Sequence, residues 1–184
     1  MQVQTLLPVP DLWTPRLWIR AFQDGDQAGI FGYASDPETA RYMVWPRHKS
    51  LADSEATLRY LLDGYLRRDD LPLAILRRSD GQLIGCTGFQ YPLRRIPWMA
   101  WMLRPDAFGQ GYGQEAAQAA LKWGWRAFPK WTHVEAPIHP KNQASIALAR
   151  KLGFVQVPSE LRFKMTNLNG RMARATNWSV ERPR

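Results

Sequence analysis

Residues 104–128 read RPDAFGQGYGQEAAQAALKWGWRAF and place three glycines, Gly109, Gly111 and Gly113, directly before a run of good helix formers. Two interpretations fit this stretch alone. One is a loop that needs positive φ angles, which glycine adopts without steric cost. The other is a cradle for an anion, because the first N–H groups of a helix have no partner inside the helix and glycines let a ligand approach them closely.

The glycine turn matches neither of two common anion-binding motifs. The dinucleotide-binding G-x-G-x-x-G pattern needs a third glycine where Gln114 stands, and the Gly-Lys-Ser/Thr of an ATP-binding P-loop is absent. The turn follows a nearly continuous apolar run, IPWMAWML at 96–103, which predicts a central strand covered on both faces. The motif is therefore a strand, a glycine turn and a helix that match neither pattern.

Hydrophobic periodicity along the chain predicts elements in the order β-αα-βββ-α-β-α-ββ. The clearest amphipathic helix covers 53–68, and a first helix is expected within 24–43. Asn142 is the expected N-cap of a helix that stops at Gly153, and Asn169–Gly170 is the expected turn of the last hairpin. Because no linker or repeat appears, 1–184 is expected to form a single α/β (α+β) domain.

Composition limits the class of protein. The chain has 184 residues, 45% hydrophobic, and a formal net charge of +9, which favours anionic ligands or surfaces. Its basic residues are scattered, so nucleic acid is not the expected partner. No apolar run is long enough for a membrane span, and a secretory signal is not evident, so we expect a cytoplasmic protein. Cys86, the single cysteine, excludes an internal disulfide and is expected to be a buried apolar residue.

Four motifs in this order carry a family resemblance: LWTPRLWIR at 12–20, DGQLIGCTGF at 80–89, WMLRPDAFGQGYGQEA at 101–116 and HPKNQASIALARKLGF at 139–154. With them the chain resembles the GNAT N-acetyltransferases, closest to the Rim-type branch that acetylates the N-termini of ribosomal proteins. The resemblance implies a central mixed, mostly antiparallel sheet of about seven strands flanked by helices. It also implies acetyl-CoA as cosubstrate, no metal, and direct transfer of acetyl to a primary amine, either a protein N-terminus or a small molecule.

The resemblance also implies a set of cofactor-binding residues. Backbone groups of Met102 and Leu103 would meet the pantetheine arm and the thioester carbonyl. Asn142 would hold the pantetheine amide, with N-capping as the alternative. Backbone N–H groups of the glycine turn would bind the pyrophosphate, and the turn comprises Phe108, Gly109, Gln110, Gly111, Tyr112, Gly113 and Gln114.

Catalytic groups are less clearly marked in the sequence. Many relatives protonate the leaving thiolate with a tyrosine where this chain has Ala149, so Ser145 is the matching hydroxyl, with local backbone bonding as the alternative. Glu160 is the candidate base, with a surface charge as the alternative. Glu115 is expected to be structural. Further candidates are a proton relay by His48 or His139 and an acceptor pocket lined by Trp45 and His48.

Two other function classes stay open. One is a non-catalytic module that binds acyl-CoA as a regulatory signal, which the missing tyrosine at Ala149 would fit. The other, less favoured, is a basic nucleic-acid-binding domain. The oligomeric state is open, a dimer included.

Overall fold

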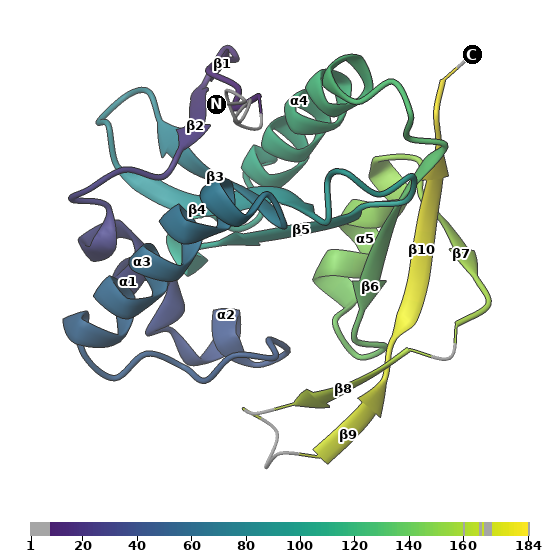
Figure 1. Ribbon diagram of the computed structural model, residues 1–184. Coiled ribbons are helices and arrows are strands. Elements are labelled where there is room, and N and C mark those ends of the chain that lie inside the picture. The colour runs from purple at the N-terminus through teal and green to yellow at the C-terminus, as the bar shows by residue number, and fades with distance from the viewer. Residues whose placement is uncertain (1–7, 160, 166, 168–170, 184) are drawn as a thin grey trace.

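The computed structural model of the chain describes residues 8–159, 161–165, 167 and 171–183. Its centre is an eight-stranded sheet in the order β1-β2-β3-β4-β5-β6-β10-β7, and β8 and β9 form a separate hairpin (Figure 1). The strands are β1 (Leu12–Trp13), β2 (Leu17–Ala21), β3 (Asp70–Arg77), β4 (Leu83–Gln90), β5 (Trp98–Leu103), β6 (His133–Ile138), β7 (Val155–Val157), β8 (Arg162–Met165), β9 (Arg171–Arg174) and β10 (Thr176–Glu181).

Helices cover both faces of this sheet. Helices α1 and α3 lie on one face and α4 on the other (Figure 1). The helices are α1 (Gln27–Ala34), α2 (Pro37–Ala40), α3 (Leu51–Arg67), α4 (Tyr112–Ala127) and α5 (Gln143–Lys151), and a short 3-10 turn, η1 (Pro105–Ala107), precedes α4. The helix expected within 24–43 is split into α1 and α2, because the residue before Pro37 is extended and caps α2 instead. None of the helices in the described residues is both long and apolar enough to cross a membrane.

The sheet alternates its side chains between two apolar cores. On β3, Leu73 and Ile75 face the core under α4, whereas Ala74 and Leu76 face α1 and α3. Cys86 of β4 belongs to the second core, as expected, and burial raises the pKa of its thiol to about 12. The central strands are apolar on both faces because helices cover both sides.

The expected mixed, mostly antiparallel sheet is confirmed, since β5 and β6 are the only strands of the described residues that pair in parallel. It has eight strands rather than about seven, because the two-residue β1 and the three-residue β7 extend its edges. The last hairpin pairs β8 with β9, and its expected turn at Asn169–Gly170 lies outside the described residues.

Strand β5 is the element where the sequence-based expectation is wrong. The apolar run predicted a strand covered on both faces, but Ala100 is exposed and Trp101, Met102 and Leu103 are partly exposed. The physical reason is that β5 and β6 pair at one position, Trp98 with Glu135, and then diverge. The apolar side chains of β5 therefore line cavities as well as the core.

Candidate active site

Three cavities adjoin one another near the point where β5 and β6 diverge. The chamber, about 230 Å³, lies between the two strands. The groove, about 480 Å³, runs along the start of α4, and the side pocket, about 460 Å³, lies between α1, α3 and the sheet. Met102 lines all three, Trp45 lines the chamber and the side pocket, and Ser145 lines the chamber and the groove. The three cavities therefore adjoin one another around Met102.

The glycine turn presents unpaired donors to the groove. Gly109 and Gly111 have φ angles of +72° and +81°, which favour glycine. In the part of the chain that the structure describes, the backbone N–H groups of residues 109–114 donate to no acceptor. Consecutive free N–H groups at a helix start create a site that favours an anion.

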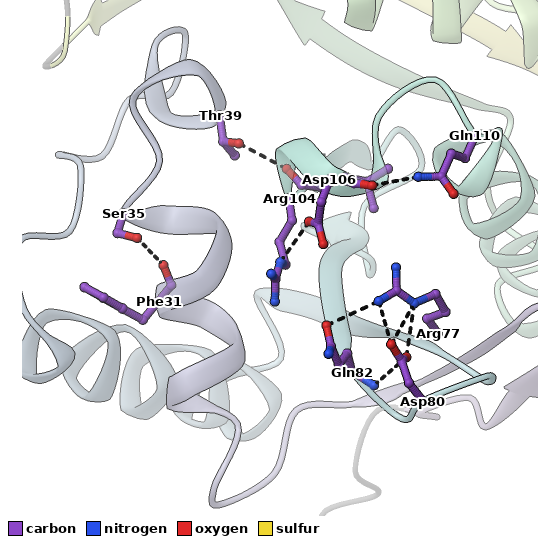
Figure 2. A network of polar contacts seen from close by, with 10 residues as sticks. Phe31, Ser35, Thr39, Arg77, Asp80, Gln82, Arg104, Asp106 and Gln110 are labelled. Atoms are coloured by element: carbon purple, nitrogen blue, oxygen red, sulfur yellow. Dashed lines mark hydrogen bonds and ion pairs between the residues drawn. The ribbon is translucent and has the colours of Figure 1, made fainter.

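Side chains fix this turn from both sides. The Arg16 guanidinium donates to the Gln110 carbonyl oxygen at 2.8 Å and to the Glu115 carboxylate at 2.7 Å. On the other side, the Gln110 amide donates to the Asp106 carbonyl oxygen at 2.6 Å, and Arg104 donates to the Asp106 carboxylate at 3.0 Å (Figure 2).

Glu115 holds the turn from behind, away from the groove. Its carboxylate accepts from the Thr14 hydroxyl at 2.7 Å as well as from Arg16. Burial by itself raises the pKa of Glu115, but the hydrogen bonds from Thr14 and Arg16 outweigh it and lower this pKa. The expected structural role of this residue agrees with these contacts.

Most of the expected cofactor residues line the groove, and two do not. The Gln110 side chain turns to Asp106, and the Tyr112 ring lies 4.6 Å under the Arg16 guanidinium. The Thr39 hydroxyl donates to the Leu103 carbonyl oxygen at 3.1 Å and fixes the end of β5 (Figure 2). The groove-lining members are Met102, Leu103, Phe108, Gly109, Gly111, Gly113, Gln114, Asn142 and Ser145.

Ser145 lies where the chamber meets the groove. Its hydroxyl oxygen accepts from the Trp101 indole N–H at 3.3 Å. Asn142 caps α5, because its side-chain oxygen accepts from the Ser145 backbone N–H at 3.2 Å. Ala149, one turn later, is fully buried. The hydroxyl of Ser145 is therefore the group that α5 offers to the cavities at this point.

The two histidines differ in what they offer. His48 is buried, with Nδ1 2.8 Å from the Ser54 hydroxyl and Nε2 3.1 Å from the Thr57 hydroxyl. Burial lowers the pKa of His48, and Asp53 partly opposes this. Its ring lines the side pocket, but both nitrogens are engaged, so a proton relay through His48 has no free ring atom to use.

His139 lines the chamber and stacks on Tyr42 at 4.8 Å. Its Nδ1 accepts from the Lys141 backbone N–H at 3.1 Å, so the neutral ring carries its proton on Nε2. Burial, followed by the charge of Lys141, lowers the pKa of His139. The neutral ring therefore has a donor at Nε2 but no free lone pair with which to act as a base.

Two residues were not expected from the sequence: Tyr42, which lines cavities, and Asn167, which holds the loop that carries it. Tyr42 lines the chamber and the groove. The Asn167 amide clamps the loop that carries Tyr42 and Trp45, donating to the Ala40 and Trp45 carbonyl oxygens at 2.7 and 2.8 Å and accepting from the Arg47 N–H at 2.9 Å. Asn167 lies more than a hundred residues after this loop in the sequence, so no local pattern reveals the clamp. Glu160, the candidate base, lies outside the described residues.

Residues 16–155 match the family model described as acetyltransferase (GNAT) domain. The chain belongs to the GNAT acetyltransferase family. It is therefore an acyltransferase, and the predicted resemblance is confirmed. This GNAT protein is 30% identical over 151 residues to an uncharacterised protein of Bacillus subtilis, YkkB, across 77% of this chain and 83% of that one.

Solved structures share the fold of this GNAT protein. The ribosomal L7/L12 alpha-N-protein acetyltransferase RimL, in complex with coenzyme A, superposes with a TM-score of 0.75 at 17% identity, across 96% of this chain and 98% of that chain. The spermidine N-acetyltransferase of Vibrio cholerae, in complex with CoA and spermine, gives a TM-score of 0.73 at 16% identity, across 92% and 97%. Identities this low indicate a common fold, which both a protein acetyltransferase and a small-molecule acetyltransferase adopt.

Proposed function

We propose that the protein transfers the acetyl group of acetyl-CoA directly to a primary amine. The observation that carries this proposal is the row of free N–H groups at residues 109–114, which faces a groove leading into the chamber. The pyrophosphate of the cofactor is the anion that this row would bind. Coenzyme A in the RimL complex supports the same ligand class for this fold. The acceptor is either a protein N-terminus or a small-molecule amine.

The reaction makes three demands on the chain. The lone pair of the neutral amine attacks the thioester carbonyl carbon and forms the C–N bond, and the nitrogen loses a proton to a base. The C–S bond breaks, and the departing sulfur takes a proton. Ser145 would donate a hydrogen bond to that sulfur, and the backbone of Met102 and Leu103 would orient the thioester. Glu160 stays the predicted base, and a cytoplasmic location stays a prediction as well.

A pair of alanine variants tests the cradle. Gly109 and Gly81 have nearly the same φ, +72° and +71°, and a Cβ at either position would meet nothing within 4 Å. Both variants therefore carry the same strain of about 1–2 kcal/mol, while only Gly109→Ala puts a methyl group in the groove. Gly109→Ala should weaken acetyl-CoA binding at least tenfold in calorimetry, and Gly81→Ala should leave it unchanged.

Equal affinity in the two variants would remove the glycine turn from cofactor binding. Turnover needs a second measurement, namely release of free thiol from acetyl-CoA in the presence of amines and N-terminal peptides. Binding of acetyl-CoA without thiol release across that panel would instead favour the non-catalytic acyl-CoA-binding module.

A further inference from the structure

The floor of the side pocket is a row of short residues on three neighbouring strands. Pro72, Gly88 and Ala100 lie opposite one another on β3, β4 and β5. A Cβ at Gly88 would come within 2.2 Å of the Leu71 carbonyl oxygen, so this position of the row admits only glycine. The row leaves a cavity under α3 that shares Trp45, Gln90, Ala100 and Met102 with the lining of the chamber.

The middle of the side pocket offers a ligand mainly apolar surface. The Thr57 hydroxyl lies 3.1 Å from His48 Nε2, and the Thr87 hydroxyl donates to the Ala100 carbonyl oxygen at 3.0 Å, so these polar groups are engaged. A polar ligand body would lose its hydration here without gaining hydrogen bonds. Aliphatic and aromatic side chains complete the wall, namely Ile30, Tyr33, Ala34, Leu61 and Phe89.

Asp70 lines the side pocket beside Gln90, and no cation of the described residues lies within ion-pair distance of it. Its partly buried carboxylate accepts from the Tyr60 hydroxyl at 3.0 Å and forms no ion pair with any residue that the structure describes. The neighbouring Arg67 pairs with Asp69 instead, and its guanidinium lies over the Tyr60 ring. Burial, which the Tyr60 hydrogen bond opposes, raises the pKa of Asp70. The Tyr60 hydrogen bond and the charge of Arg67 favour the ionised carboxylate, but neither is an ion pair, so a bound cation would recover more of the free energy that partial burial costs.

We propose that the side pocket binds an acceptor with two positive groups, a primary amine that reaches the chamber and a second cation that pairs with Asp70, joined by an apolar spacer. The inference rests on the proposed acetyl transfer and names its acceptor class. By strand register, Asp70 is two strands and two residues from Ala100, which is about 12 Å. Allowing for the aspartate side chain, the two nitrogens would lie roughly 10 Å apart, the span of a diamine with about seven carbons.

Three amines with seven carbons each test the acceptor class. Each offers a primary amine for acetylation, and the opposite end is a second ammonium group in diaminoheptane, a methyl group in heptylamine and a carboxylate in aminoheptanoate. Because hydrogen bonds to charged groups are the stronger ones, kcat/KM for the diamine should exceed that for heptylamine by roughly tenfold to a hundredfold. Aminoheptanoate should be the poorest of the three.

Variants of Asp70 and Asp63 test whether Asp70 binds the second cation. Asp70→Asn keeps the shape and can still accept from Tyr60, so it should lose the preference for the diamine while retaining heptylamine turnover. Asp63→Asn removes the same charge from an exposed position of α3 and should keep the preference. A preference that survives in Asp70→Asn would overturn the role of Asp70.

The outcomes separate this inference from the proposed function. Equal turnover of the three amines by the unaltered protein overturns the two-cation acceptor and leaves acetyl transfer standing. Absence of thiol release with all three also overturns the acceptor class. If acetyl-CoA then fails to bind in calorimetry as well, the proposed function itself is overturned.

Discussion

The Ser145 hydroxyl has one proton, and its hydrogen bond with Trp101 leaves that proton free to be donated. An indole N–H can only donate, so the hydrogen bond from Trp101 at 3.3 Å makes the serine oxygen an acceptor. The serine proton can then point into the chamber or the groove, both of which Ser145 lines. A donor aimed at a developing thiolate stabilises charge that appears only as the reaction proceeds.

Ser145→Ala should lower kcat at least tenfold and leave the acetyl-CoA dissociation constant nearly unchanged, because proton-transfer assistance is typically worth about 10²–10⁴-fold. The N-cap bond uses the backbone N–H of Ser145 and survives the substitution. Thiol release gives kcat, and calorimetry gives the dissociation constant. A variant with normal kcat would exclude Ser145 from the mechanism, whatever its stability.

Because the pKa of His48 is lowered, we expect the free energy of unfolding to depend on pH. Burial lowers its pKa in the folded protein below the ordinary value of 6.5, so the unfolded chain binds a proton that the folded chain does not. Stability should therefore fall as the pH drops from about 6.5 towards the folded pKa. Urea unfolding at several pH values should reveal this slope, and His48→Gln should flatten it in that range. Identical slopes in both proteins would show that His48 does not cause it.

At the scale of elements, the β8–β9 hairpin holds the loop between α2 and α3 through one amide. Asn167→Ala removes three side-chain hydrogen bonds to this loop and should raise the acceptor KM severalfold, because Tyr42 and Trp45 lose their fixed positions. Acetyl-CoA affinity, measured by calorimetry, should change less. Lys164→Ala, an exposed change on β8, is the control and should leave both unaltered. An unchanged acceptor KM in Asn167→Ala would mean that the loop keeps its position without the clamp.

Local patterns predicted the elements better than they predicted the cavities. Helix α3 and the turn before α4 follow from hydrophobic spacing and from glycines, which are properties of a short segment. The partial exposure of β5 depends on where β6 leaves it, and the loop that carries Tyr42 and Trp45 is held by Asn167, more than a hundred residues later. Such features arise from contacts between segments that are separate in the sequence, so composition and periodicity cannot predict them.

At the scale of the whole molecule, one core crosses the point where β5 and β6 diverge. Phe89 on β4, Trp131 before β6 and Trp178 on β10 belong to the same buried cluster, although they lie on different sides of that point. We therefore expect 1–184 to unfold as a single unit in urea, with tryptophan fluorescence and far-ultraviolet circular dichroism giving the same midpoint. Two separated midpoints would contradict a single domain.

The divergence of β5 from β6 has a consequence for self-association. Beyond Trp98, one side of β5 pairs with none of the strands that the structure describes, so an unpaired strand edge lies inside the sheet and not at its border. Exposed edges invite pairing with other chains and are usually blunted by charges or proline. Strand β5 can remain apolar because another polypeptide would have to enter between two strands of the same sheet to reach it. A slender molecule that carries its own amide groups could enter there, so the feature that excludes a foreign strand selects for a ligand that resembles one.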